Sequence, residues 1–277
     1  MPERITRIKI GKDKDAAFNN LESLYEKEKH LISQSFFFEG ANGKAVLLVH
    51  GWTAVPYELR RLGTYLNENG YAVSGPILKG HATVPEDLEN VRWEDWLASV
   101  EEAYNELAQK YDQVHIIGTS IGAVLAMMVA REKKGVTSLT LMAMPYRLRM
   151  EKFLFFVLRM IAPFKKYAKK AYPPSFGFSE SITRRTAYRR YPIASVLEVF
   201  HLVRHAREKL SEVTQPSFIM QSEIDNIIDR KSAEEIYARI GSKIKKKKHI
   251  KRAYHTFISD IRNEHVFEDI LKFIEEN

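Results

Sequence analysis

The sequence predicts an α/β protein with a mostly parallel central sheet, helices on both faces and an inserted helical cap. Short apolar runs typical of buried strands alternate with segments of helical periodicity, which indicates a parallel sheet joined by crossover helices. The alternation stops near Pro145 and resumes at Ser217, so the interval between them is an insertion. The expected division is a core of residues 1–144 and 211–277, with 1–34 as an N-terminal extension, and a cap of residues 145–210.

The first elements follow from local patterns. An amphipathic stretch places Phe18, Leu21, Leu24 and Tyr25 at helical spacing, and we expect it outside the main sheet. Residues 36–38 and 45–49 have the composition of strands, and the second run is continuously apolar, as in a strand buried on both faces. Asn42-Gly43 between them predicts a hairpin. The next expected elements are a helix at 56–69, a strand at 71–73, a helix at 93–110, a strand at 114–117, a helix after Ser120 and a strand at 138–143.

The insertion is rich in Phe, Tyr, Arg and Lys, with helical stretches at 151–161 and 194–210 separated by Tyr172-Pro173-Pro174. We expect it to cover the carboxyl edge of the sheet, where open α/β folds bind ligands. Its run 153–164 has three interpretations: packing of the cap onto the core, an acyl-chain pocket, or contact with an anionic lipid surface through the lysines that follow. After it come a strand at 217–220, a helix at 232–240, a lysine-rich strand at 243–250 and a helix at 264–275.

The composition is that of a soluble globular protein, with 45% hydrophobic and 28% charged residues among 277. The charged N-terminus lacks the apolar core of a signal peptide, so the expected compartment is the cytoplasm. Zero cysteines exclude disulfides, a thiol nucleophile and thiolate metal sites. The net charge of +8 includes the run Lys245 to Lys248, which we interpret as an aggregation-resistant edge strand, and we expect no nucleic-acid partner.

The pentapeptide Gly118-Thr119-Ser120-Ile121-Gly122 lies between a strand-like and a helix-like run. In a nucleophile elbow, a strand turns sharply into a helix, and glycines on either side of the serine leave room for that turn. Ser120 is therefore the candidate nucleophile.

A serine hydroxyl needs a base, and the base needs an acid that orients it. In this order of elements, both follow the serine on loops after later strands. The loop after the 217–220 strand offers Glu223, Asp225 and Asp229, of which we choose Asp225, and the other two are expected to be solvated or to cap the next helix. His255 follows the last strand directly and is the candidate base.

Acyl transfer also needs donors for the developing oxyanion. The backbone N–H of Ile121, the residue after the nucleophile, is one candidate. The other is the N–H of Trp52, in the His50-Gly51-Trp52-Thr53 loop after the 45–49 strand. We expect His50, Trp52 and Ile121 to contact the substrate, and the Trp52 indole could equally be a core side chain.

These segments, together with Phe257-Ile258-Ser259-Asp260 after His255, resemble the α/β-hydrolase superfamily, and within it the bacterial carboxylesterase and monoacylglycerol lipase group. That group often has a Leu-Pro-Gly-His-Gly-Thr stretch, and this chain has Leu78-Lys79-Gly80-His81-Ala82-Thr83, which departs at Lys79 and Ala82. Trp93-Glu94-Asp95-Trp96 matches a further stretch of the group, which we interpret as helix packing. The resemblance covers about residues 36–275 and is weakest through the cap.

The resemblance implies a cytosolic serine hydrolase that cleaves short or medium acyl esters, or monoacylglycerols, without a metal or organic cofactor. Its implied partner is a small ester or lipid substrate. Two alternatives stay open: an acyltransferase that uses the same acyl-enzyme, and a non-catalytic small-molecule-binding protein on the same fold. Relatives with dehalogenase or epoxide hydrolase chemistry have an aspartate where this chain has Ser120.

Overall fold

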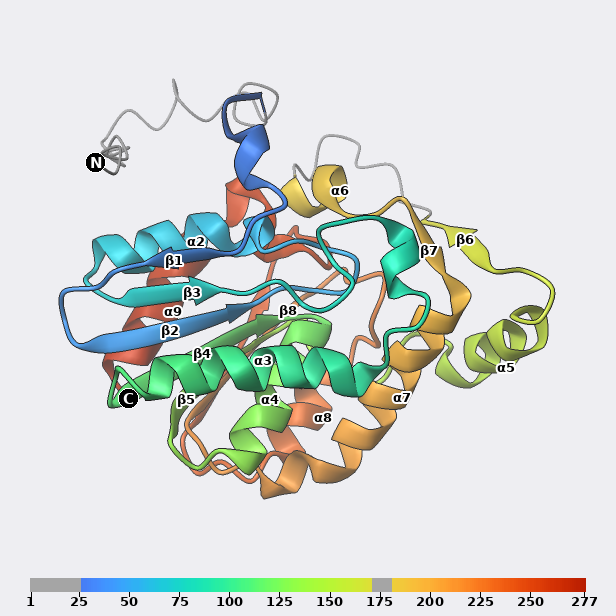
Figure 1. Ribbon diagram of the computed structural model, residues 1–277. Helices are drawn as coiled ribbons and strands as arrows, with labels where there is room; N and C mark the ends of the chain where they lie inside the picture. The colour runs from blue at the N-terminus through green and yellow to red at the C-terminus, as the bar shows by residue number, and fades with distance from the viewer. Residues whose placement is uncertain (1–25, 171–180) are drawn as a thin grey trace.

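The computed structural model describes residues 26–170 and 181–277, with a seven-stranded sheet at the centre (Figure 1). Its strand order is β1-β3-β2-β4-β5-β8-β9. The outermost strand, β1, is antiparallel to β3, and the other neighbours are parallel. This confirms the predicted mostly parallel sheet. The strands are β1 (Phe36–Phe38), β2 (Lys44–Val49), β3 (Ala72–Gly75), β4 (Gln113–Thr119), β5 (Val136–Met142), β8 (Ser217–Ser222) and β9 (Lys245–Ile250).

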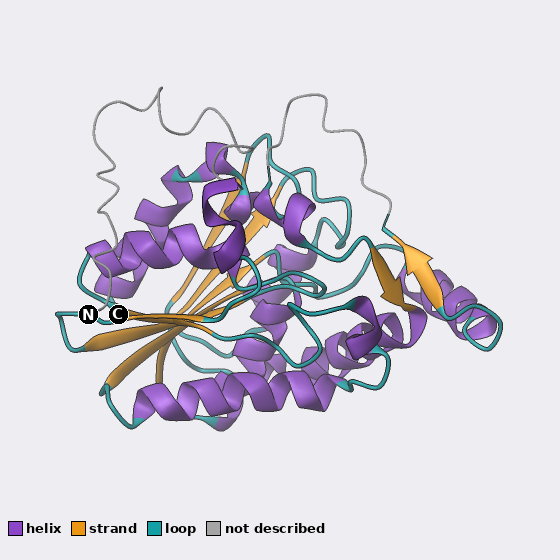
Figure 2. Ribbon diagram, turned by 45° about the horizontal axis from the view of Figure 1, so that its top comes forward, coloured by secondary structure: helices purple, strands orange, loops and turns teal. Residues whose placement is uncertain are grey.

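Helices cover both faces of this sheet, as the view along the sheet makes clear (Figure 2). The helices are α2 (Tyr57–Glu68) and α9 (His265–Glu275) on one face, and α3 (Trp93–Ala108), α4 (Ile121–Glu132), α7 (Ile193–Lys209) and α8 (Ser232–Arg239) on the other. The position of β2 between two helical layers explains why its residues 45–49 are continuously apolar. Ala45, Leu47 and Val49 join one core cluster, whereas Val46 and Leu48 join the other, because successive side chains of a strand point to opposite faces.

The predicted hairpin between the first two strands is wrong. Strand β3 lies between β1 and β2, and Phe36 pairs with Gly75 rather than with a residue of β2. The turn itself is present, because Gly43 has a φ of 73°. A turn motif specifies a local reversal of the chain, whereas the pairing partner is decided by the later strand that occupies the intervening position.

Two other expectations can be located in the structure. Strand β9 is the edge strand of the sheet and carries the lysine run, as predicted. Helix α3 begins at Trp93, and Trp96 is fully buried, so this stretch serves helix packing. The predicted amphipathic residues Phe18, Leu21, Leu24 and Tyr25, and the segment Tyr172-Pro173-Pro174, lie outside the described residues.

The insertion has two parts that differ in packing. Helix α7 packs against α4, and its buried Val199, Leu202, Val203 and Ala206 belong to the same core cluster. The outer part of the insertion, which comprises the elements around α5, contains a short antiparallel strand pair, β6 with β7, which was not predicted from the sequence. Its elements are α5 (Glu151–Ile161), β6 (Tyr167–Lys169), α6 (Ile182–Thr186) and β7 (Arg190–Pro192). The division of the chain at residues 145 and 210 stays a proposal.

Short 3-10 helices occur at several connections of the described chain. They are η1 (Lys29–Leu31), η2 (Pro85–Leu88), η3 (Leu210–Glu212), η4 (Phe257–Ser259) and η5 (Ile261–Asn263). Helix η4 follows directly on the loop that carries His255 and packs against α2. It thereby anchors that loop on the face of the sheet opposite α4.

Candidate active site

The predicted site residues come from four loops at the carboxyl ends of parallel strands. His50 to Thr53 follow β2, Ser120 follows β4, Asp225 follows β8 and His255 follows β9. Because parallel strands end at the same edge of a sheet, these loops converge in space. The structure brings Ser120, Asp225 and His255 into one cluster at this edge.

Ser120 occupies a sharp turn between β4 and α4. Its φ of 54° and ψ of −121° are rare for a residue with a side chain and cost roughly 1–3 kcal/mol. The surrounding packing holds this conformation, since the Ser120 N–H donates to the Met142 carbonyl at 2.8 Å. A Cβ atom on Gly118 would lie 2.2 Å from the Gly122 oxygen, and one on Gly122 would lie 2.2 Å from the Val49 oxygen. Both glycines are therefore required for the turn.

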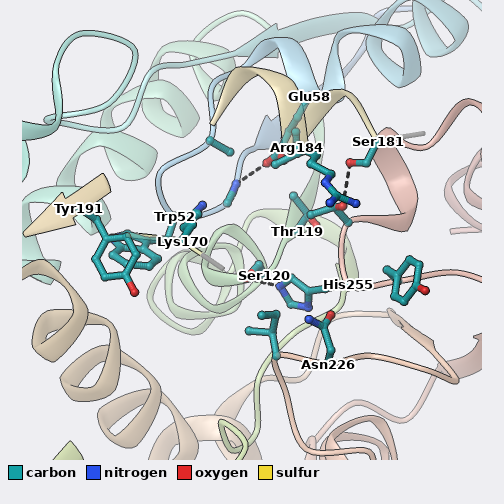
Figure 3. A pocket seen from close by; sticks show the side chains of 16 residues that line it. Trp52, Glu58, Thr119, Ser120, Lys170, Ser181, Arg184, Tyr191, Asn226 and His255 are labelled. Atoms are coloured by element: carbon teal, nitrogen blue, oxygen red, sulfur yellow. Dashed lines mark hydrogen bonds between the residues drawn. The ribbon is translucent and has the colours of Figure 1, made fainter. Parts of the chain in front are cut away.

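Ser120, His255 and Asp225 form one continuous chain of hydrogen bonds. The Asp225 Oδ2 lies 2.8 Å from His255 Nδ1, and the His255 Nε2 lies 2.9 Å from Ser120 Oγ. A carboxylate only accepts, so Nδ1 carries the proton and Nε2 is free to accept from the serine hydroxyl. Figure 3 shows the imidazole pointing at Ser120 at the floor of a cavity. This arrangement can remove the serine proton as the oxygen attacks.

Asp225 is held as an ionised acceptor. Its Oδ1 accepts the backbone N–H groups of Ile227 and Ile228 at 2.8 and 3.0 Å. Burial raises the pKa of Asp225, but the charge and hydrogen bond of His255 and these two N–H groups outweigh it, so the pKa lies below its ordinary value. The competing carboxylates Glu223 and Asp229 are exposed, and Asp229 accepts the Lys231 N–H just before α8.

Two backbone N–H groups lie beside the nucleophile without an acceptor of their own. Within the part of the chain that the structure describes, neither the Trp52 N–H nor the Ile121 N–H donates to a protein atom. The Ile121 N–H is the first of helix α4, where N–H groups have no intrahelical partner. Such amides can accept a developing negative charge on a substrate oxygen.

The structure corrects the expectation that His50 contacts the substrate. His50 is fully buried behind the loop, where Nδ1 donates to the Gly51 carbonyl at 2.9 Å and Nε2 accepts the Leu78 N–H at 3.1 Å. Its neighbour His81 accepts the Thr53 N–H at 2.9 Å. Burial lowers the pKa of His50 to about 4 and holds the pKa of His81 well below its ordinary value, so both rings are neutral and brace the loop.

A cavity of about 260 Å³ opens above Ser120. Trp52 and Tyr191 form one wall, with ring centres 4.8 Å apart, and the Trp52 indole donates to Ser195 Oγ at 2.8 Å. The wall therefore joins the loop after β2 to the insertion. Ile121 is buried in the core, so only its N–H can reach the cavity. The described residues that line the cavity include Ala54, Glu58, Thr119, Lys170, Ser181, Thr183, Arg184, Asn226, Ile227 and Tyr254.

Sequence reasoning missed Glu58, a buried carboxylate in the first turn of α2. Its Oε1 accepts the Gly51 N–H at 2.5 Å, and its Oε2 accepts the Thr183 hydroxyl at 2.6 Å (Figure 3). Burial raises the pKa of Glu58 above its ordinary value, although these bonds and the charge of Lys170 oppose the shift. In the sequence it resembles a surface glutamate of an amphipathic helix. The signal that could have identified Glu58 is its position seven residues after Gly51, at the start of the helix that follows this loop.

Lys170 was also missed as a cavity residue. Its ammonium donates to Thr53 Oγ1 and lies 5.6 Å from the centre of the Trp52 ring. Burial lowers the pKa of Lys170 to about 8, and Glu58 opposes the shift. In the sequence it is the last of a lysine cluster that a solvated surface would explain equally well.

The chain resembles known ester-cleaving enzymes in sequence. It is 28% identical over 252 residues to a carboxylesterase of Bacillus subtilis (strain 168), covering 89% of this chain and 98% of that protein. It is 29% identical over 241 residues to a thermostable monoacylglycerol lipase of Bacillus sp. (strain H-257), covering 85% and 92%.

Solved structures share the fold. One from a study of the metagenome-derived lipolytic enzymes LipS and LipT aligns with a TM-score of 0.81 at 24% identity, covering 89% of this chain and 98% of that chain. The Paleococcus ferrophilus monoacylglycerol lipase gives 0.74 at 15% identity, covering 88% and 99%. A family model described as serine aminopeptidase, S33, matches residues 40–262. The chain therefore belongs to the S33 serine aminopeptidase family of α/β-hydrolases.

Proposed function

We propose that this protein is a serine hydrolase that cleaves carboxylic esters through an acyl-enzyme on Ser120. The observation that carries the proposal is the hydrogen-bond chain from Asp225 through His255 to Ser120, with the Trp52 and Ile121 amides beside it. The names of the relatives, a carboxylesterase and a monoacylglycerol lipase, support ester bonds as the target.

In the first half of the reaction, the Ser120 oxygen attacks the ester carbonyl carbon while His255 Nε2 takes the hydroxyl proton. The carbonyl oxygen becomes an oxyanion, and the Trp52 and Ile121 N–H groups donate to it. His255 then protonates the leaving alcohol oxygen as the carbon–oxygen bond breaks. Asp225 holds the imidazole in the required tautomer and stabilises its charged form.

In the second half, a water molecule takes the place of the alcohol. His255 removes a proton from the water, the oxygen attacks the acyl carbon, and the proton returns to the Ser120 oxygen. The products are the free acid and the regenerated enzyme. Each proton passes through His255, so no metal or organic cofactor is required by this scheme.

The cavity supports a small substrate. Its volume of about 260 Å³ lies just below the roughly 300–1,000 Å³ of typical ligand pockets. The aromatic side chains of Trp52 and Tyr191 suit an acyl chain, and Glu58, Lys170 and Thr183 add polar groups to the lining. We therefore expect short or medium acyl esters, or monoacylglycerols with such chains, to be preferred.

An acyl-chain series from acetyl to palmitoyl p-nitrophenyl esters, with the matching monoacylglycerols, tests the proposal. We expect kcat/KM to be highest for short or medium chains and Ser120→Ala to lose about 10⁶-fold. Undiminished turnover by Ser120→Ala would remove this serine from the mechanism. Labelling of Ser120 by a phosphonate, without turnover of any ester, would instead favour an acyltransferase or a non-catalytic binding protein.

A further inference from the structure

Helix α5 exposes four of its eight large apolar side chains to solvent. None of its residues is buried, and its exposed side chains range from 40% for Leu154 to 64% for Phe156. Phe164, just after the helix, is 90% exposed. The expectation that these residues pack the cap onto the core therefore fails for this face.

The exposed side chains share one side of the helix. Phe153, Phe156 and Met160 recur at spacings of three and four residues, which is the helical repeat, and the exposed Met150 and Phe164 flank the helix at its two ends. The opposite side faces α7, where Phe155 packs on Phe200 with ring centres 5.6 Å apart. Helix α5 is thus amphipathic, but its apolar stripe faces outward instead of toward the core. Figure 1 shows the helix at the outer end of the molecule, away from the sheet.

Basic side chains surround this apolar stripe. Residues 147–170 contain eight lysines and arginines and one acidic residue, Glu151, in a chain whose total net charge is +8. Lys152, Arg159, Lys165 and Lys169 are exposed, and none of them has an ion-pair partner among the described residues. The segment that contains α5 therefore carries a local excess of positive charge, and four of its cations are exposed and unpaired among the described residues.

The lysine-rich strand β9 shows that a basic run need not leave its charges uncompensated. Lys247 pairs with Glu234 at 3.2 Å, and Lys248 pairs with Asp269. Lys245 and Lys246 lie over the rings of Tyr237 and Phe218, at 5.1 and 4.9 Å from the ring centres. The four lysines of β9 thus have acidic or aromatic partners within the fold, whereas the exposed cations around α5 have no ion-pair partner among the described residues.

We propose that α5 docks on the surface of an anionic lipid bilayer. An interfacial helix buries an apolar face at the boundary between headgroups and acyl chains, while basic residues attract anionic headgroups. The apolar stripe and the flanking cations of α5 supply both contributions. At eleven residues the helix is too short to cross a bilayer, and no other described helix has the length and hydropathy for it.

A second copy of the chain is the other candidate occupant of this face. Two copies joined through α5 would bring two clusters of excess positive charge together, which opposes association. An anionic surface neutralises the same charges. The charge around the stripe therefore favours lipid. Strand β6 follows α5 in the chain and leads to the cavity residue Lys170.

Vesicle binding by the full-length chain tests this inference independently of catalysis. The Ser120→Ala background prevents any turnover of lipid, and its affinity is measured by co-sedimentation with vesicles of phosphatidylcholine alone or equimolar with phosphatidylglycerol. We expect binding to the mixed vesicles only, weakened by salt. The triple change Phe153→Ser, Phe156→Ser and Phe164→Ser should weaken binding about 100-fold or more.

Removing cations tests the electrostatic part. The triple change Lys152→Gln, Arg159→Gln and Lys165→Gln should weaken binding about 100-fold. The matched control, Lys134→Gln, Lys243→Gln and Lys251→Gln, removes the same charge from exposed sites elsewhere and should have little effect. Thermal melting checks that each variant folds.

Several outcomes would overturn the inference. Absence of binding to mixed vesicles, or equal binding to both vesicle types, excludes docking on an anionic surface. Equal losses in the two cation variants would mean that only the net charge matters. Full binding by the phenylalanine variant would mean that α5 does not insert, and a dimer that dissociates in that variant would identify a second copy as the occupant.

Discussion

Helices α4 and α5 are similar in length and in apolar content, yet they have opposite environments. Ten of the twelve residues of α4 are buried, and none of the eleven of α5 is. Helix α4 follows the central strand β4 and lies between the sheet and the helices α3 and α7. Helix α5 lies in the outer part of the insertion, and α7 is the element of the described chain that packs most closely against it.

This difference teaches that an apolar helix is buried because of its place in the topology. A buried α4 can hold Ser120 in a strained turn at its N-terminus, as the proposed mechanism requires. An exposed α5 can offer its apolar face to something outside the chain. If the two regions have separate roles, a change in one should alter hydrolysis or stability, and a change in the other should alter vesicle binding.

Among changes that leave the Ser120 nucleophile in place, the largest effect is expected at Asp225. Asp225→Asn would let His255 adopt the wrong tautomer, and we expect kcat to fall about 10⁴-fold. Glu223→Gln and Asp229→Asn are the controls, because both side chains are exposed on the same loop. Ester hydrolysis is measured for all three, and vesicle binding should stay unchanged in each. A greater loss in either control would mean that another carboxylate orients the histidine.

Matched truncations test the comparison of the two helices directly. Leu125→Ala removes a fully buried side chain of α4 and should lower the free energy of unfolding by about 2–5 kcal/mol. Phe156→Ala on α5 should change it by about 0.5 kcal/mol or less, because its side chain is 64% exposed. Urea unfolding measures both. A large destabilisation by Phe156→Ala would show that α5 is packed in solution.

Substitutions of Glu58 test whether its hydrogen bond must hold the loop after β2 in place. Glu58→Ala leaves the Gly51 N–H without its acceptor, and we expect kcat to fall about 100-fold with little change in KM. Glu58→Gln keeps an acceptor oxygen and should recover much of this loss. Glu68→Gln, at an exposed position of the same helix, serves as the control. Equal losses in Glu58→Gln and Glu58→Ala would mean that the negative charge matters rather than the hydrogen bond.

A further effect is a dependence of stability on pH from the buried histidines of the core. Burial lowers the pKa of His50 and His115 from 6.5 to about 4, so between these values the unfolded chain binds protons that the folded chain does not. Stability should be intact above pH 6.5 and fall as the pH drops toward 4, by about 1.4 kcal/mol per pH unit for each histidine. Urea unfolding of His115→Gln should show a shallower decline, and an identical decline would contradict this assignment.

Most strands and helices of the core could be predicted from the sequence, because burial determines which of their residues are apolar. A strand between two helical layers must be apolar on both sides, and Ala45 to Val49 met that condition. The positions of Ser120, Asp225 and His255 could be predicted because each follows a strand of one parallel sheet. Asp225 required a choice among three carboxylates, which the sequence alone does not separate.

What the sequence did not reveal depends on contacts between distant segments. The Glu58 carboxylate meets Gly51 and Thr183, which lies 125 residues further along the chain. The ring of His50 turns away from the cavity because Leu78, on another loop, supplies a donor. The β6 and β7 pair is too short, and too mixed in character, for its alternation to stand out.

The central claim is that Ser120 carries the acyl group during turnover. Rapid acid quench of the wild-type protein with a p-nitrophenyl acyl ester, followed by peptide mass spectrometry, tests it directly. We predict a mass increase equal to the acyl group on the peptide that contains Ser120, and no such adduct in Ser120→Ala. Turnover of the ester with the acyl group on another residue, or with the adduct persisting in Ser120→Ala, would contradict the account.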